Sequence, residues 1–359
     1  MAYAAITKPE LNFNCTLHTG TGSTQQITTG LNMSANGGMV WNKLRSGTNN
    51  HVLWDTIRTA TKTIYPDLTA QEATEATSLT AFTTTGWTAG GTGNTNANGS
   101  TYVSWNWLAG SSHSGSSNSD GSTASTVTAN TAAGFSMFKF TGTNGNTTVG
   151  HGLGGVPEMF IIKNTAQAGH WMVYHKDLQS PAGKQMYLNL TNAQASDTGW
   201  LQNTAPSSSV ITLGANADSN GSGNTMIGYA FRSIKGYSKI GKYQGNGGSD
   251  GTFVYCGFRP ALVLFKVGYA SSGSDFTGNW QLLDNRRTTS GGNNQNQTLY
   301  PNSNIADQNE GDIDILSNGF KLRSTGNDSN SSSGVYMYYA VAENPIVANV
   351  GQSIPATAR

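Results

Sequence analysis

The chain has 359 residues with a formal net charge of +1, from 20 basic and 19 acidic side chains, and only 11% of its residues are charged. Typical soluble domains carry about 25% charged residues, so Ser, Thr, Asn and Gly must supply much of the polar surface here. No basic stripe of the kind that binds nucleic acid is present, and no apolar run reaches the roughly 18 residues of a membrane-spanning helix. We therefore expect no nucleic-acid partner and no membrane insertion.

The same composition predicts the fold class. Ser, Asn and Gly favour turns over long helices, and Thr also suits strands, so we expect an all-β protein. The length exceeds that of one ordinary hydrophobic core and predicts two or three domains.

Residues 1–15 contain no basic segment followed by an apolar core, so we expect no export signal there. They end in a strand-like run, which we interpret as an N-terminal strand or an anchor to a partner. Cys15 and Cys256 are the only cysteines and lack the spacing of a metal or redox motif. We expect both thiols to be reduced and buried.

Three segments of the chain resemble one another in the same order. Each has a glycine-rich turn and then a strand-like run that closes on a lysine, namely Lys43, Lys163 or Lys266. The lysine stands six residues after a turn former in every case, which is Gly37, Pro157 or Pro260. A short strand follows, at 51–55, 171–175 or 280–284, and an aromatic strand closes each copy, at 102–109, 226–233 or 336–343. This order predicts three tandem antiparallel β-sandwich repeats of jelly-roll-like type.

Changes in composition mark the boundaries between these repeats, which we place at residues 16–110, 134–233 and 234–345. Residues 111–133 are rich in Ser, Gly and Thr and hold no large apolar side chain, so they predict a flexible or extended linker. Residues 346–359 form a C-terminal tail. Only residues 69–82 resemble a short helix.

Side chains alternate between the two faces of a strand. In the first closing strand Trp105 and Trp107 share one face, while the small Ser104 and Asn106 share the other. We predict that the large side chains face the core of their own repeat and that the small ones face outward. The lysine-terminated runs, such as 159–163, are apolar at successive positions, which predicts central strands covered on both faces.

The repeated lysines have acidic counterparts in two of the three copies. We predict structural ion pairs between Lys43 and Asp55 and between Lys266 and Asp284, each joining adjacent strands. In the second copy the matching position holds His175. Because an architectural pair can lose its acid in one copy, we interpret these residues as structural and not catalytic.

Few other ionisable residues are grouped. His170 and His175 are an odd number of positions apart, so a strand would place them on opposite faces, which argues against a shared metal ion. Asp312 and Asp314 share a face; such a pair could hydrolyse a glycosidic bond or bind calcium, but we favour a solvated strand edge. No nucleophile elbow or Cys/His arrangement is present. We expect no catalytic residue, no metal site and no cofactor.

Loops rich in Asn, Ser and Gly precede the closing strand in all three copies. Amides can hydrogen-bond to sugar hydroxyls, and aromatic rings stack on apolar sugar faces. We predict ligand-binding positions in these loops at eight asparagines: Asn94, Asn96, Asn98, Asn216, Asn220, Asn224, Asn327 and Asn330. A purely solubilising role for the loops is an equal alternative.

The stretches "GHGLGGVPEMFIIKN", "GKYQGNGGSDGTFVYCGFRPALVLFK" and "LSNGFKLRSTG" resemble repeat segments of tail-fibre-like virion structural proteins of tailed bacteriophages from marine environments. The stretch "KPELNFNCTLHTGTGSTQQITTGL" is similar to the start of such proteins. The resemblance covers nearly the whole chain and is weakest in the Ser/Gly/Thr-rich linker. The first copy departs from it, because "NMSANGG" replaces the Gly-Phe-X-Pro turn around Pro260.

The resemblance implies a non-enzymatic virion surface protein of tail-fibre or adhesin type, assembled in the host cytoplasm. Its implied partners are other virion proteins of the tail or capsid and a glycan or protein of the host cell surface, and it could form a homo-oligomer. One alternative is a capsid decoration protein or head fibre on the phage shell, because three related domains could imitate a trimer at a three-fold position. Another is a secreted protein that binds or hydrolyses glycans.

Overall fold

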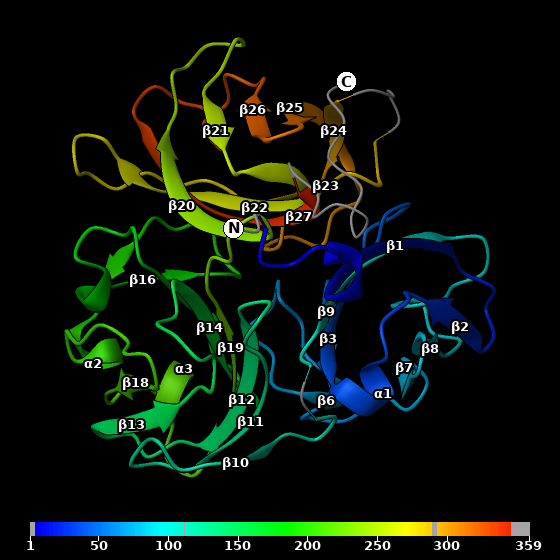
Figure 1. The fold of residues 1–359 in the computed structure, drawn as a ribbon, viewed down its shortest axis with the longest axis vertical. Helices are drawn as coiled ribbons and strands as arrows, with labels where there is room; N and C mark the ends of the chain where they lie inside the picture. Colours follow the sequence, from blue (N-terminus) through cyan, green and yellow to red (C-terminus); the bar gives the residue numbers. More distant parts are fainter. Residues whose placement is uncertain (1–3, 111, 289–292, 346–359) are drawn as a thin grey trace.

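A computed structural model describes residues 4–110, 112–288 and 293–345. The expected C-terminal tail, 346–359, lies outside the described residues. Figure 1 shows three lobes around a common centre, which we call lobe 1 (residues 13–109), lobe 2 (112–232) and lobe 3 (238–345). The protein is built mainly of antiparallel β-sheets, so the all-β prediction is confirmed.

Lobe 1 consists of an inner sheet toward the centre and an outer sheet. The inner sheet has the order β1 (Phe13–Thr19), β9 (Thr101–Leu108), β3 (Gly38–Leu44), β4 (Val52–Asp55). The outer sheet has the order β2 (Gln25–Thr28), β8 (Gly86–Ala89), β7 (Leu79–Thr83). Smaller elements are the 3-10 helix η1 (Pro9–Leu11), which precedes the lobe, helix α1 (Met33–Asn36) and the pair β5 (Lys62–Thr63) and β6 (Ala73–Thr74).

Lobe 2 has the corresponding four strands within a larger inner sheet. They are β12 (Phe135–Thr141), β19 (Thr225–Phe231), β14 (Met159–Asn164) and β15 (Met172–His175). The flanking strands are β10 (Ser116–Asn118) and β11 (Ser125–Asn130) on one side, and β16 (Lys184–Tyr187) and β17 (Ala195–Ser196) on the other. The outer sheet pairs β13 (Thr147–Gly150) with β18 (Val210–Leu213), and the helices are η2 (Pro181–Gly183), α2 (Thr198–Leu201) and α3 (Ala217–Asn220).

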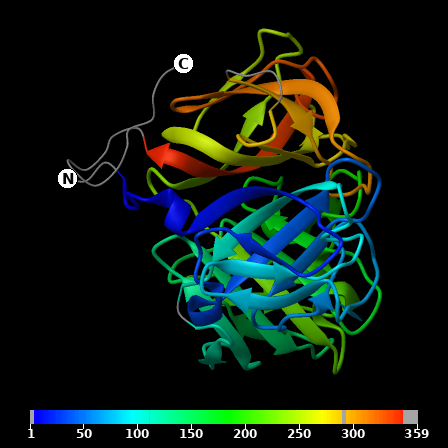
Figure 2. The ribbon, with the colours of Figure 1, turned by 90° about the vertical axis from the view of Figure 1, so that its right-hand side faces the viewer.

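Lobe 3 has two four-stranded sheets. The inner order is β20 (Ser238–Gln244), β27 (Gly334–Pro345), β22 (Phe258–Ala270), β23 (Gln281–Asp284). The outer order is β21 (Phe253–Tyr255), β26 (Gly319–Leu322), β25 (Gln308–Leu316), β24 (Asn294–Thr298). Four corresponding strands therefore have the same order in all three inner sheets: the strand before the glycine-rich turn, the closing strand, the lysine-terminated strand and the short strand after it. Figure 2 shows that β27 ends beside η1, so the two ends of the described chain lie on one side.

The central strands of the inner sheets are buried on both faces. Every residue of β14 is buried, which confirms the lysine-terminated runs as central strands. The predicted facing of the closing strand is wrong, because Trp105 and Trp107 belong to the core between the lobes, while Asn106 faces the core of its own lobe. The small side chains leave room for large neighbours: a Cβ on Gly228 would lie 2.1 Å from the Phe138 ring.

A continuous apolar core fills the centre where the inner sheets meet. Equivalent strand positions of the three lobes contribute Met39, Met159 and Leu262, and all three side chains are buried. The cavity that remains measures about 20 Å³ and has only apolar and aromatic residues in its wall. Since a single water needs at least about 10–15 Å³ of such space, the centre offers no room for a ligand.

Two predictions about the connections are wrong. The predicted linker 111–133 is not free over its described part, residues 112–133, because these form β10 and β11, and β11 pairs with β12 along its length. Their small polar side chains suit this position, since they bond to the outer sheet: the hydroxyls of Thr123 and Thr147 are 2.6 Å apart. Residues 69–82 form β6 and the start of β7 and no helix, because Leu79 enters the core of lobe 1.

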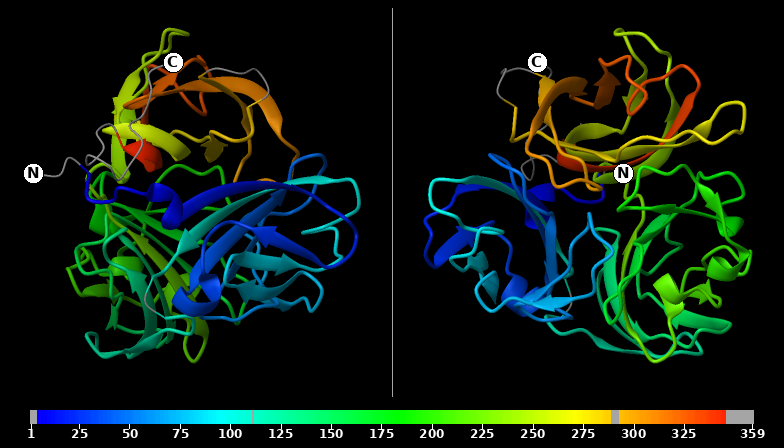
Figure 3. Two further views of the ribbon diagram at one scale, coloured as in Figure 1. Left: turned by 45° about the vertical axis from the view of Figure 1, so that its right-hand side comes forward. Right: turned by 180° about the vertical axis from the view of Figure 1, so that it is seen from behind.

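Each lobe is joined to another by the same type of backbone hydrogen bond. The donor N–H and the acceptor C=O belong to Gly169 and Thr69 (2.8 Å), Gly278 and Thr191 (2.9 Å), and Asn49 and Asn304 (2.8 Å). These bonds link lobe 2 to lobe 1, lobe 3 to lobe 2, and lobe 1 to lobe 3, so they close a ring. Figure 3 shows the result from two further sides, with the inner sheet of lobe 3 lying across those of lobes 1 and 2.

Candidate functional site

Three of the eight predicted asparagines are buried, at the same place in each lobe: Asn96, Asn220 and Asn330. Each carboxamide oxygen accepts a backbone N–H of the glycine-rich turn that follows β1, β12 or β20. The donors are Thr21, Thr143 and Asn246, at 2.8, 2.8 and 3.1 Å. Each carboxamide nitrogen donates to a carbonyl of the same turn, which belongs to Ser23, Gly145 and Gly248. The ligand-binding prediction is therefore wrong for these three, which clamp two loops together.

The clamp also explains the glycine that opens each turn. A Cβ at this position would lie 2.1–2.3 Å from a carbonyl oxygen of the asparagine loop. The glycine and the facing carbonyl are Gly20 and Ala97, Gly142 and Gly221, and Gly245 and Ser331. Only glycine permits so close an approach of two backbones. The repeated turn is thus half of a structural unit, and the asparagine is its other half.

The other five asparagines lie in the same three loops and are not brought together. Asn98 and Asn327 are exposed, whereas Asn94 and Asn224 are partly buried. Asn216 caps α3 by accepting the N–H of residue 218 at 3.0 Å, and it also bonds to Asp197. The predicted positions are therefore spread over three lobes and form no single site.

The repeated lysines are buried and bond to backbone carbonyls. Lys163 donates to Thr69 of lobe 1 at 3.1 Å, and Lys266 donates to Thr191 of lobe 2 at 3.0 Å. Lys43 donates to Leu44 within its own lobe at 2.6 Å. Burial lowers the pKa of Lys43 and Lys163 to about 8 and that of Lys266 to about 7. Lys163 and Lys266 thus join neighbouring lobes, whereas Lys43 bonds within lobe 1.

The predicted ion pairs of Lys43 with Asp55 and of Lys266 with Asp284 are wrong. The β3–β4 register places Met39 opposite Asp55, so Lys43 lies four residues further along, at about 13 Å. The acids pair with arginines instead, Asp55 with Arg58 and Asp284 with Arg287, both at 2.6 Å.

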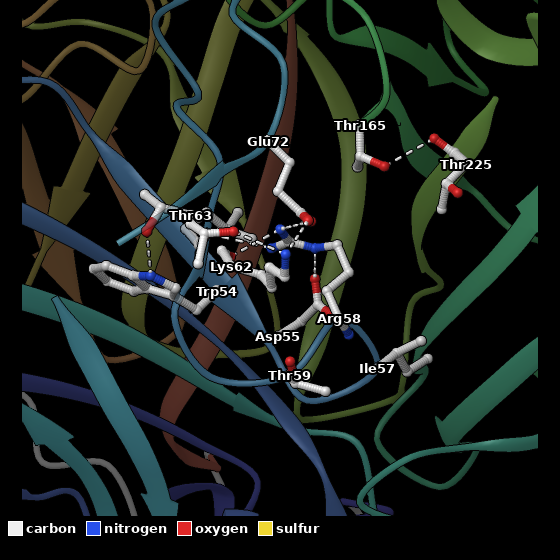
Figure 4. Close-up of polar contacts among 12 residues, drawn as sticks. Trp54, Asp55, Ile57, Arg58, Thr59, Lys62, Thr63, Glu72, Thr165 and Thr225 are labelled. Atoms are coloured by element: carbon white, nitrogen blue, oxygen red, sulfur yellow. Dashed lines mark hydrogen bonds and ion pairs between the residues drawn. The ribbon is translucent and has the colours of Figure 1, made fainter. Parts of the chain in front are cut away.

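The Asp55 pair is part of a buried network, shown in Figure 4. Arg58 also bonds to Glu72 at 3.0 Å, and Tyr229 of lobe 2 donates its hydroxyl to Asp55 at 2.6 Å. In lobe 3 the indole of Trp105, from lobe 1, donates to Asp284 at 2.9 Å. Both acids are thus fixed between lobes, and their role is architectural.

Two large aromatic side chains are exposed on the outer sheet of lobe 3. Phe253 and Tyr255 are 43% and 48% exposed, and they alternate with the buried Val254. They lie on β21, an edge strand whose partner is β26. Opposite Tyr255 stands Gly319, which contributes no side chain beside the ring. The pair therefore presents apolar surface to solvent.

A polar groove of about 490 Å³ lies beside Tyr255, where lobe 2 meets lobe 3. The ammonium of Lys239 lies 5.3 Å from the centroid of the Tyr255 ring and donates to the Tyr255 carbonyl at 2.7 Å. On the side of lobe 2, Glu158 pairs with Lys176 at 2.6 Å and accepts the hydroxyl of Ser233 at 2.8 Å. We call this groove, together with Phe253 and Tyr255, the aromatic groove.

The aromatic groove combines the two kinds of group that sugars require. Exposed rings can stack on the apolar face of a pyranose, and fixed carboxylate, ammonium and hydroxyl groups can hydrogen-bond to its hydroxyls. This arrangement can bind a glycan.

The sequence contained a signal for this surface that the repeat comparison did not use. The buried residues Ile27, Val149 and Val254 occupy the same position in the three outer sheets. Their two neighbours are Gln26 and Thr28 in lobe 1, Thr148 and Gly150 in lobe 2, and Phe253 and Tyr255 in lobe 3. Only lobe 3 has aromatic residues at both of these outward positions, which distinguishes its outer surface from those of lobes 1 and 2.

Other kinds of site find less support in the described part of the chain. Within residues 4–110, 112–288 and 293–345, no three His, Cys, Asp or Glu side chains converge as a metal-binding group. Over the same ranges no helix has the length and apolar character needed to cross a membrane. Both cysteines are free and buried, as expected.

The chain belongs to the protein family described as a domain of unknown function (DUF7483), whose match spans residues 8–345. The match covers all three lobes, so the lobes together make up one family unit. None of the curated proteins matches the chain.

Proposed function

We propose that this member of a family of unknown function is a non-enzymatic surface protein of a tailed bacteriophage virion, and that it binds a host envelope glycan through the aromatic groove. The exposed pair Phe253 and Tyr255 carries this proposal. Exposed rings on a strand add nothing to the core, and a pair beside a polar groove favours a binding surface. The resemblance of the sequence to virion structural proteins supports the location on the particle.

We also infer that the three lobes are copies of one β-sandwich, of which lobe 3 has become the binding copy. The shared inner strand order, the asparagine clamp and the ring of interface hydrogen bonds support this inference. Because the inner sheets are buried against one another, the copies can differ mainly on their outer sheets. The aromatic pair of lobe 3 lies in that variable layer.

The binding proposal is tested with the double substitution Phe253→Ser/Tyr255→Ser in the full chain. Binding to a panel of bacterial envelope polysaccharides and to intact cells is measured by calorimetry and pull-down. We expect the variant to bind at least about tenfold more weakly, equivalent to about 1.4 kcal/mol, because stacking is lost. The matched control is Gln26→Ser/Thr28→Ser on the outer sheet of lobe 1, which should bind like the wild type. Equal binding by both variants would exclude the aromatic groove as the site.

A capsid decoration protein is the second candidate. The observation that favours it is the closed arrangement of three lobes around one centre, which fits a three-fold position of a capsid lattice. Stoichiometric binding to empty phage capsids, unchanged in the Phe253→Ser/Tyr255→Ser variant and without binding to cells, would favour this function over the first.

A further inference from the structure

An acidic pocket of about 430 Å³ lies in lobe 3, between β25 and the loop that precedes β27. Three of its wall residues are acids and none is basic; the wall consists of Gln281, Glu310, Asp312, Ser324, Gly326, Asn327, Asp328 and Ser329. The nearby arginine at position 323 does not neutralise it, because its guanidinium bonds to Asp314 and Asp250 outside the pocket. The pocket is therefore a concentration of negative charge, and its other polar side chains are amides and hydroxyls.

Two of the acids lie against each other. Asp312 is 3% exposed, and its carboxylate accepts the hydroxyls of Thr298 and Ser329, both at 3.3 Å. Glu310 lies within hydrogen-bonding reach of Asp312 and accepts the hydroxyl of Tyr300. Burial and the negative charge of Glu310 raise the pKa of Asp312 to about 7. Such a pair is stable when a proton or a cation offsets one of its charges.

A buried amide forms part of the same pocket wall. Gln281 is 1% exposed, and its side-chain oxygen accepts no hydrogen bond among the described residues. A buried acceptor without a partner costs about 1–3 kcal/mol, and either a hydrogen-bond donor or a cation could satisfy it. The carboxylate of Asp328, in contrast, already has hydrogen-bond donors. The backbone N–H and the side-chain amide of Asn279 donate to it, at 3.0 and 2.8 Å.

We propose that the acidic pocket binds a divalent cation of the calcium type through the carboxylates of Asp312 and Glu310 and the side-chain carbonyl of Gln281. The donor set decides the class of ion: carboxylate, amide and hydroxyl oxygens suit calcium, whereas zinc prefers nitrogen and sulfur. Two carboxylates with neutral oxygens and water correspond to a weak site, with a dissociation constant of about 0.1–1 mM. The site does not depend on glycan binding, which lies elsewhere on lobe 3.

Lobe 1 has a glutamate at the corresponding position, and neutral groups surround it. There Glu75 accepts hydrogen bonds from Tyr65, Thr63 and Asn94, at 3.3 and 3.4 Å for the last two. The spacing of ten residues between tyrosine and glutamate is the same as between Tyr300 and Glu310 in lobe 3. Neutral donors satisfy Glu75 in lobe 1, while in lobe 3 a second acid, Asp312, lies beside Glu310. Glu75→Gln is therefore a matched control.

The test is calorimetric titration of the full chain with CaCl₂ after chelation with EDTA, together with thermal unfolding in calcium and in EDTA. We expect one calcium ion to bind per chain and to raise the unfolding temperature. Asp312→Asn and Gln281→Met should each weaken binding at least about tenfold, while Glu75→Gln should bind like the wild type. The absence of calcium binding to the wild type, or unchanged binding to folded Asp312→Asn and Gln281→Met proteins, would overturn the proposal.

Discussion

Lobes 1 and 3 bury an aspartate and an arginine at the position where lobe 2 buries a histidine and a leucine. The three pairs are Asp55 with Arg58, Asp284 with Arg287, and His175 with Leu178. All lie at the end of the short strand after the lysine and face a neighbouring lobe. Burial lowers the pKa of His175 to about 3, so lobe 2 places a neutral ring where the other lobes place a charge.

This difference shows that the interface can be formed either by a charged Asp–Arg pair or by a neutral histidine. Burial opposes ionisation of Asp284, but the guanidinium of Arg287 and its hydrogen bonds bring the pKa of this carboxyl below its ordinary value. In lobe 2 the neutral ring of His175 fills the corresponding space at the interface. Its ring nitrogen lies 3.3 Å from the carbonyl oxygen of Tyr338 in lobe 3. The interface thus accepts either chemistry, provided that no charge is left without its partner.

The largest expected effect comes from removing one member of a buried pair. Arg287→Leu should lower the free energy of unfolding by about 3–5 kcal/mol, because the carboxylate of Asp284 remains buried without its cation. The double substitution Asp284→His/Arg287→Leu copies lobe 2 and should restore more than half of that loss. Urea unfolding of the three proteins measures both changes. A double variant no more stable than Arg287→Leu would show that lobe 2 relies on contacts that lobe 3 does not have.

The sequence predicted the strand order along the chain well, because alternation, turn residues and the repeat all carry that information locally. Lys163 and its apolar run were recognised as a central strand since both faces of the run are apolar. The facing of Trp105 and Trp107 was not predictable in the same way, because alternation defines two faces without telling which core each face meets. The second core exists only when three lobes assemble around one centre.

The candidate site shows the same limit. The asparagines were recognised as a repeated feature, and their polar loops suggested that they are exposed. Asn330 is structural because a turn distant in the sequence lies against it and bonds to its side chain. The ion pairs failed because Arg58 and Arg287 stand three residues after their acids and compete at closer range than the lysines. Phe253 and Tyr255 were visible in the sequence, yet their exposure depends on β21 being an edge strand.

Lobe 2 shares the asparagine clamp with the other lobes. Replacing the clamp asparagine should therefore lower the free energy of unfolding by a similar amount in every lobe. Asn330→Ala removes the buried carboxamide that accepts the Asn246 N–H and donates to Gly248, and it should cost about 2–4 kcal/mol. Asn220→Ala should cost a similar amount, while Asn98→Ala, at an exposed position, should stay within about 0.5 kcal/mol. Thermal and urea unfolding provide the measurement. A neutral Asn220→Ala would indicate that lobe 2 holds its turn by other contacts, such as those of β10 and β11.

The smallest expected effect concerns the buried lysines, two of which bond across an interface while Lys43 bonds within its own lobe. For Lys266 the folded pKa of about 7 lies below the unfolded value of 10.5, so between these pH values the unfolded chain binds more protons and stability rises with pH. Compared with Lys266→Met, the wild type should gain roughly 1 kcal/mol per pH unit between about pH 7.5 and 9.5. Urea unfolding at several pH values tests this gain, with Lys8→Met, at an exposed position, as the control for removing a lysine charge. A pH-independent difference for Lys266→Met would mean that the folded protein keeps this ammonium charged, held by the carbonyls of Thr191 and Gly278.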